Sequence, residues 1–188
     1  MRKLTVFNNV SLDGYFTDAK NDMSFAYNDR QDPEWDAYVN GNASGEGILI
    51  FGRITYEMMA SYWPTPAAAA NMPQVAQGMN KSQKIVFSRT LDKVSWANTR
   101  LVKEDLVGEI RRMKAESGSD MVILGSGSIV SQLAQAGLID EYQLVVTPVA
   151  LGQGRTLFDG MKEKLPLTLV WTRTFENGNV VLCYRPRA

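Results

Sequence analysis

The residues that could carry chemistry in this sequence are carboxylates, hydroxyls, lysines and arginines, because histidine is absent and the only cysteine is Cys183. Without histidine, a Ser-His-Asp triad, a Cys-His pair and an HExxH zinc site are excluded, and no metal site is expected. Hydride transfer suits the remaining set, since a bound cofactor carries the reactive atom and the protein mainly positions it. The single cysteine rules out an internal disulfide and indicates a reducing compartment, the cytoplasm.

The string GSGS at residues 125–128 is the clearest sign of a ligand site. It follows the apolar run MVIL and precedes a helical pattern, so its backbone N–H groups could approach a diphosphate at the carboxyl end of a strand. The match to the dinucleotide-binding fingerprint stops after two glycines, because Val130 occupies the third glycine position and no Walker lysine follows. The string therefore predicts a nucleotide phosphate site, and a tight connection without a ligand is the alternative.

Length and composition indicate one domain spanning residues 1–188, since 188 residues with 45% hydrophobic content suffice for one well-buried core. Twenty basic and twenty acidic residues cancel without long runs of one sign, which argues against a nucleic-acid or membrane-surface protein. No apolar run approaches the roughly 18 residues of a membrane span. The expected partner is a small molecule or a second copy of the chain.

The first half of the chain alternates strands and helices. A strand is predicted at 3–10 and a polar, aromatic loop at 15–32. Asp32-Pro33 has the form of a helix N-cap followed by proline at the first position, with the helix running to about Asn40. A buried strand at 47–51 leads into a helix that ends before Pro64, and residues 64–80 are expected to form a surface loop or loose helix.

The second half continues the alternation and ends in a hairpin. Strands are predicted at 84–88, 97–102, 121–124 and 142–151, with helices at 105–116 and 129–137. Segments 167–175 and 180–185 flank Asn177-Gly178, which is a strong hairpin signal. The predicted fold class is α/β: a mostly parallel central sheet, layered between helices, with an antiparallel C-terminal hairpin.

Five strings in order make the chain resemble the dihydrofolate reductase-like superfamily, in the branch that includes the C-terminal reductase domain of bacterial riboflavin biosynthesis. They are SLDG (11–14), GRITYE (52–57), VFSR (86–89), ILGSG (123–127) and ALGQGRTLF (150–158). The resemblance covers essentially the whole length. It implies a single-domain, three-layer fold and an NADPH-dependent reductase that transfers hydride to a pterin-like or pyrimidine-like substrate, such as a 5-amino-6-ribosylaminouracil.

The resemblance also implies which residues bind the cofactor. Arg53, Ser88 and Arg89 lie where the family holds the adenosine end and its 2′-phosphate, and a guanidinium suits that dianion. The second glycine of the dihydrofolate reductase turn, joined there by a cis peptide, is replaced by Ser126, and the sequence leaves open whether a cis bond persists. The complete expected set is Gly52, Arg53, Thr55, Ser88, Arg89, Gly125, Ser126, Gly127 and Ser128.

The substrate side of the implied site is defined by fewer residues. Asp36 is the candidate proton-handling acid, with a solvated helix acid as the alternative, and Asp13 is a second candidate, with turn chemistry as its alternative. Trp35 and Arg155 are candidates for substrate binding. A nucleotide-binding or regulatory protein that kept the fold without turnover is the rival hypothesis. Relatives are often homodimers, and edge strands and the terminal hairpin would allow a homodimer here, but the sequence leaves the oligomeric state open.

Overall fold

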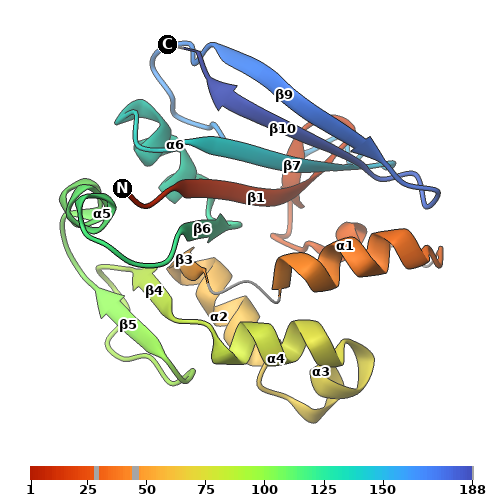
Figure 1. The fold of residues 1–188 in the computed structure, drawn as a ribbon, viewed down its shortest axis with the longest axis horizontal. Helices are drawn as coiled ribbons and strands as arrows, with labels where there is room; N and C mark the ends of the chain where they lie inside the picture. Colours follow the sequence, from red (N-terminus) through yellow and green to blue (C-terminus); the bar gives the residue numbers. More distant parts are fainter. Residues whose placement is uncertain (28–29, 44–46, 188) are drawn as a thin grey trace.

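The computed structural model describes residues 1–27, 30–43 and 47–187, and its centre is an eight-stranded sheet (Figure 1). The strand order is β5-β4-β3-β6-β1-β7-β10-β9, and the first six of these strands are parallel. The strands are β1 (Leu4–Ser11), β3 (Ile48–Gly52), β4 (Lys84–Phe87), β5 (Thr99–Val102), β6 (Met121–Leu124), β7 (Glu141–Thr147), β9 (Leu167–Thr174) and β10 (Val180–Pro186).

The predicted fold class is confirmed, including the C-terminal hairpin. Strands β9 and β10 pair antiparallel, and β10 joins the parallel part through β7. Gly178 in the connecting turn has a φ of +92°, a conformation that favours glycine. Cys183 on β10 is fully buried, and burial raises the pKa of its thiol to about 12, as expected of a small core residue.

Helices cover both faces of the sheet. One face packs against α5 and α6 through a core that includes Val6, Ile110, Ile123 and Leu133. The other packs against α2, α3 and α4 through a second core, and α1 lies on that same face over β7 and β10. The helices are α1 (Pro33–Ala43), α2 (Arg53–Tyr62), α3 (Pro66–Asn71), α4 (Pro73–Lys81), α5 (Leu106–Ala115) and α6 (Gly127–Gln135), with a 3₁₀ turn, η1, at Ser24–Ala26.

Residues 64–80 differ from the sequence-based expectation of a surface loop or loose helix. They form α3 and α4, whose Val75, Ala76 and Met79 are buried against the sheet. Each helix begins with proline at its first position, where the missing N–H would have no intrahelical acceptor. The prolines therefore start helices here rather than prevent them.

The segment 15–32, expected to be a loop, contains a strand whose partner lies far along the chain. Strand β2 (Tyr15–Asp18) pairs antiparallel with β8 (Gly154–Thr156) in a separate two-stranded sheet. We call residues 15–26 together with β8 the flap. The predicted N-cap is confirmed, since Asp32 accepts hydrogen bonds from the backbone N–H groups of Glu34 and Trp35 at 2.9 and 3.0 Å.

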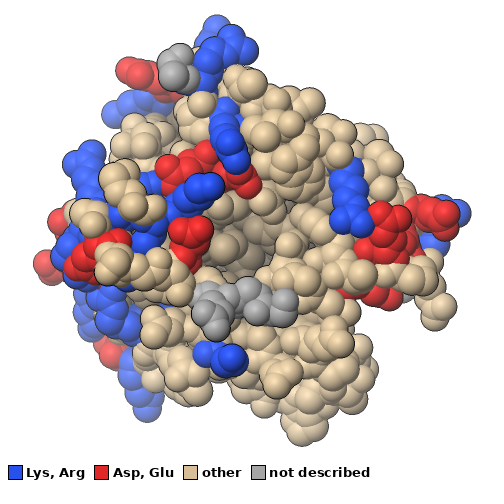
Figure 2. Space-filling view, in the orientation of Figure 1, with Lys and Arg blue, Asp and Glu red and all other residues tan. Residues whose placement is uncertain are grey.

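The surface mixes both charge signs. On the face shown in Figure 2, basic and acidic side chains lie next to one another around the margin, and the centre is hollowed and largely uncharged. Across the described ranges, no helix combines the length and the apolar character needed to cross a bilayer. Within the same ranges, no group of three or more potential metal ligands comes together.

Candidate functional site

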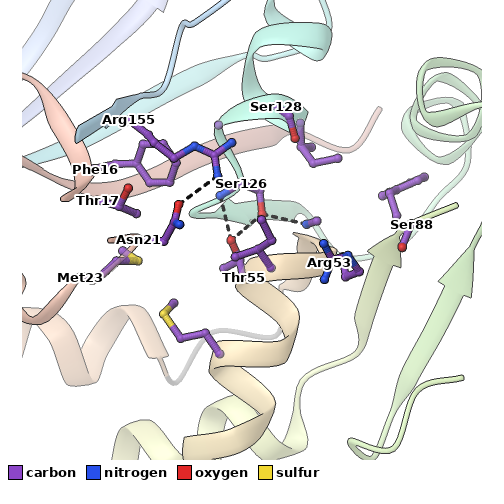
Figure 3. A pocket seen from close by; sticks show the side chains of 16 residues that line it. Phe16, Thr17, Asn21, Met23, Arg53, Thr55, Ser88, Ser126, Ser128 and Arg155 are labelled. Carbon is purple, nitrogen blue, oxygen red and sulfur yellow. Dashed lines mark hydrogen bonds between the residues drawn. The ribbon is translucent and has the colours of Figure 1, made fainter. Parts of the chain in front are cut away.

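A cavity of about 230 Å³ lies at the carboxyl ends of β3, β4 and β6, where ligands bind in open α/β sheets (Figure 3). The flap covers one side of it with Phe16, Thr17, Asn21 and Met23. The structure brings together most of the residues expected to bind the cofactor. Those that line the cavity are Gly52, Arg53, Thr55, Ser88, Ser126, Gly127 and Ser128.

The glycine-serine turn is shaped by two consecutive left-handed residues. Gly125 has a φ of +59° and Ser126 a φ of +61°, and the peptide bond between them is trans. A Cβ on Gly125 would lie 2.8 Å from both Cγ2 and Oγ1 of Thr55, and a Cβ on Gly127 would lie 2.9 Å from Cε1 of Phe16. Contacts that short are repulsive, so both positions require glycine.

Hydrogen bonds hold this turn against β1 and α2. Asn8 accepts from the Gly125 N–H at 2.5 Å and donates to the Gly125 carbonyl at 3.3 Å. The Thr55 hydroxyl accepts from the Ser126 N–H at 3.1 Å and from the Ser126 hydroxyl at 3.0 Å, and Ser126 Oγ accepts from the Gly52 N–H at 2.8 Å. Thr55 therefore positions the turn rather than presenting an unused hydroxyl to a phosphate.

Two helices begin at the cavity, α2 at Arg53 and α6 at Gly127. In α6 the N–H groups of Ile129 and Val130 donate to the Ser126 carbonyl, whereas no described residue accepts from Gly127 or Ser128 N–H. Unpaired N–H groups at a helix start, with the partial positive charge of the helix dipole, favour an anion. The geometry suits a phosphate group at this edge.

The two arginines at the cavity have different partners. Arg53 forms an ion pair with Glu57 one turn along α2, at 2.9 Å, and both side chains are about half exposed. Arg155 on β8 donates to Asn21 Oδ1 at 3.2 Å and, among the described residues, pairs with no carboxylate. Figure 3 shows the two arginines on different sides of the cavity, with Ser126 between them. An elongated anionic ligand could therefore contact both.

Ser88, Arg89 and Thr17 differ in where they lie relative to the cavity. Ser88 lines the cavity, and its Oγ accepts from the backbone N–H groups of Thr90 and Leu91. Arg89 is exposed and lies outside the cavity lining. Thr17 lines the cavity and is 6% exposed, and its covered hydroxyl has no hydrogen-bond partner among the described residues. A buried, unpaired hydroxyl is the kind of group that a polar ligand satisfies.

The structure brings neither candidate acid to this cavity. Asp13 accepts from the Ser11 hydroxyl at 2.6 Å and from the N–H groups of Leu151 and Gly152 at 3.1 and 2.7 Å. These bonds, the one from Ser11 above all, lower the pKa of Asp13 to about 2. Asp13 thus ties the β1–β2 turn to the loop before β8, which is the turn chemistry given as its alternative.

Asp36 and Trp35 lie on different sides of α1. Asp36 is exposed and borders a groove between α1 and α4, away from the cavity. Trp35 points toward the sheet, with its ring edge-on to Phe175 at a centroid distance of 5.0 Å and tilted against Tyr38 at 5.8 Å. Its position is that of a packing residue beside β7 and β10.

Sequence reasoning missed Asn8, Thr17, Asn21, Met23 and Met58. Asn8 could have been noticed as a polar residue at an inward position of an apolar strand. The flap residues carried no such signal, because their position depends on pairing between β2 and β8, which are more than a hundred residues apart in sequence.

Comparison with known proteins fits this geometry. Residues 2–181 match the family model described as the RibD C-terminal domain. The chain is 28% identical to the uncharacterized protein YyaP of Bacillus subtilis (strain 168) over 136 residues, 72% of each chain. It is 29% identical to the uncharacterized protein YwjB of the same organism over 187 residues, 100% of this chain and 99% of YwjB.

Solved structures share the fold over the full length. A putative riboflavin biosynthesis protein from Shewanella sp. PV-4 superposes with a TM-score of 0.74 and 21% identity, covering 99% of both chains. Dihydrofolate reductase from Enterococcus faecalis, solved with NADP(H), superposes with a TM-score of 0.64 and 16% identity, covering 99% of this chain and 97% of the other. With its strand order, its glycine-serine turn and a family match over residues 2–181, the chain belongs to the RibD C-terminal domain family.

Proposed function

We propose that this protein is an NADPH-dependent reductase that transfers hydride to a small pyrimidine-like or pterin-like ring. The observation that carries the proposal is the convergence of two helix N-termini, α2 and α6, on one cavity flanked by Arg53 and Arg155. Such an arrangement is suited to a phosphorylated dinucleotide. The solved dihydrofolate reductase complex with NADP(H), which shares the fold, supports this choice of cofactor.

The residues present fit NADPH in three respects. The N–H groups of Gly127 and Ser128 would hold a phosphate at a place where the Gly127 backbone leaves no room for a side chain. The unpaired Thr17 hydroxyl and Arg155 would contact the same ligand from the flap. Arg53 and Ser88 would bind the 2′-phosphate end. When bound, NADPH supplies the hydride.

The protein's own contribution is positioning and exclusion of water. Phe16, Met23 and Ile129 give the cavity an apolar side that suits an uncharged ring. Because neither Asp13 nor Asp36 lies at the cavity, a carboxylate from α1 does not serve as proton donor in this proposal. A pyrimidine-type substrate is therefore favoured over a pterin, whose reduction depends on such an acid.

The test is a titration of purified protein with NADPH and with NADH, followed by assays of cofactor oxidation. The substrate panel pairs ribosylaminouracil-type compounds with dihydropterins. We expect tighter binding of NADPH than NADH and oxidation with an aminouracil. If neither cofactor binds at millimolar concentration, the proposal is wrong.

The rival is a nucleotide-binding protein without turnover, and the absence of both candidate acids from the cavity favours it. Tight binding of NADPH, with no oxidation by any member of the panel, would support that rival. The relatives YyaP and YwjB are uncharacterized and do not separate the two.

A homodimer through β9 is our proposal for the second partner. Strand β9 is the last in the sheet, and its Leu169 and Val170 are 49% and 42% exposed. An edge strand with exposed apolar residues is a template for pairing with another chain. Analytical ultracentrifugation of the wild type and Val170→Lys tests this, since a monomeric wild type contradicts it.

A further inference from the structure

Arg155 on the flap has no carboxylate partner among the described residues, although it is held in place by a neighbour. It lines the cavity, and its Nη1 donates to the side-chain oxygen of Asn21 at 3.2 Å (Figure 3). Across the cavity, Arg53 forms an ion pair with Glu57 at 2.9 Å instead. An amide oxygen orients a guanidinium without cancelling its charge, whereas a carboxylate cancels it. Arg155 is therefore the stronger attractor of an anion.

The pairing of β2 with β8 sets the position of Arg155. Thr17 and Arg155 lie directly opposite each other, so their side chains share one face of the two-stranded sheet. The register shifts between Tyr15 and Thr17, which makes Phe16 an extra residue in β2, and such a bulge changes the direction of side chains. Phe16 and Thr17 consequently both line the cavity although they are consecutive in a strand.

The turn at residues 18–22 fixes Asn21. Asp18 Oδ1 accepts from the N–H groups of Lys20 and Asp22 at 2.7 and 2.8 Å, and the Asp18 carbonyl accepts from the Asn21 N–H at 3.1 Å. Asn21 has a φ of +64°, a conformation that asparagine tolerates better than most residues. Asp22 accepts from the N–H and the hydroxyl of Ser24 at 2.9 and 2.7 Å. Both acids of the turn are thus bonded within it, and the group that reaches Arg155 is an amide.

Arg155 has donors left for a ligand. The bond to Asn21 uses Nη1, and no described residue accepts from Nη2 or Nε. A guanidinium edge with two free N–H donors matches two oxygens of one phosphate group. The covered Thr17 hydroxyl, also without a partner in the described ranges, lies on the same face of the flap. The flap therefore has the groups that a phosphate requires.

We propose that Asn21 is a positioning residue for Arg155 and that the two form a phosphate subsite on the flap side of the cavity. Asn21 orients the guanidinium and leaves its charge available. The identity of the ligand rests on the proposed function, since the phosphate belongs either to the diphosphate of NADPH or to a phosphorylated substrate.

The test uses Asn21→Asp, which keeps the size of the side chain and its tolerance of the left-handed backbone but places a carboxylate against Arg155. Arg155→Met removes the cation, and the double variant combines both changes. Gln153→Glu is the matched control, because it adds the same charge two residues from Arg155 at a position outside the cavity lining. Calorimetry measures the binding of NADPH, of ribose 5-phosphate to NADPH-saturated protein, and of inorganic pyrophosphate.

We expect Asn21→Asp to weaken NADPH and pyrophosphate about fivefold, the effect of one exposed charge contact, with no loss in melting temperature. Most of this effect should vanish in the Arg155→Met background, because no guanidinium remains for the new carboxylate to pair with. Gln153→Glu should change binding by less than about twofold, since a solvent-exposed charge is screened. Weakening of ribose 5-phosphate alone would assign the same subsite to the substrate.

The phosphate subsite is excluded if changes at residues 21 and 155 leave the binding of all three probes unchanged, and NADPH binding would then support the reductase without it. A positioning role for Asn21 is excluded if Asn21→Asp weakens binding by the same factor with and without Arg155. Pyrophosphate binding that depends on Arg155, in a protein that does not bind NADPH, supports the subsite and contradicts the proposed cofactor.

Discussion

The two faces of β1 differ in how their asparagine side chains are hydrogen-bonded. On one face Asn8 joins the glycine-serine turn, where Asn8, Gly125, Ser126 and Thr55 satisfy one another. On the other face the side-chain oxygen of Asn9 is covered and has no hydrogen-bond partner among the described residues. The hydrogen bonds of the first region hold the starts of α2 and α6 against β1, whereas the Asn9 side-chain oxygen contributes no such bond.

The most damaging change to the completed side should be Gly125→Ala. The added Cβ would meet Thr55 at 2.8 Å, and φ is +59°, so left-handed strain adds to overpacking for a loss of about 3 kcal/mol. Gly152→Ala is the control, since its φ is +74° but no atom lies within 4 Å of the new Cβ. Urea unfolding should show a loss of about 1 kcal/mol for the control. Equal losses would mean that the contact with Thr55 is unimportant.

The comparison of the two asparagines is sharpened by replacing each with alanine. Asn8→Ala leaves the Gly125 N–H and carbonyl buried and unpaired and should cost about 2 kcal/mol in the free energy of unfolding. Asn9→Ala removes an oxygen that has no partner and should cost less than about 1 kcal/mol. Chemical denaturation of both variants measures the difference. A larger loss in the free energy of unfolding for Asn9→Ala than for Asn8→Ala would contradict the assignment of the stabilising hydrogen bonds to Asn8.

The cofactor side is tested by Arg53→Ala. Loss of one charge-assisted contact should weaken NADPH about tenfold and change NADH little, because only NADPH carries the 2′-phosphate. Glu57→Gln is the control. It removes the ion-pair partner of Arg53 but keeps the guanidinium, so it should not weaken the binding of NADPH. Fluorescence titration measures the four dissociation constants. An equal loss for both cofactors would remove Arg53 from the 2′-phosphate site.

The smallest expected effect is the pH dependence due to Asp13. Its pKa is lowered to about 2 in the folded protein from an ordinary 3.8, so its bonds to Ser11, Leu151 and Gly152 stabilise the fold above that ordinary value. This contribution should fade as the pH falls from about 4 to about 2. Asp13→Asn should flatten that part of the acid-unfolding curve while leaving neutral behaviour nearly unchanged. An identical acid profile for the variant would show that the anchor is not energetically significant.

Much of the fold follows from local sequence chemistry. The apolar runs gave the parallel strands, Asp32-Pro33 gave the start of α1, and Asn177-Gly178 gave the hairpin turn. The glycine positions 125 and 127 were also readable, since backbone that approaches other atoms closely needs glycine. These features depend on residues within a few positions of one another, so a pattern in the chain is enough to predict them.

Tertiary structure alone decided which side chains meet. Asp36 faces outward and Trp35 inward because α1 turns by a fixed angle per residue and packs one side on β7 and β10. Asp13 reaches Gly152, and Arg155 reaches Asn21, because β2 pairs with the distant β8. Asn9 and Val145 become neighbours only through the pairing of β1 with β7. Sequence patterns determine the elements, whereas long-range pairing, whose energy is shared among distant residues, determines the site.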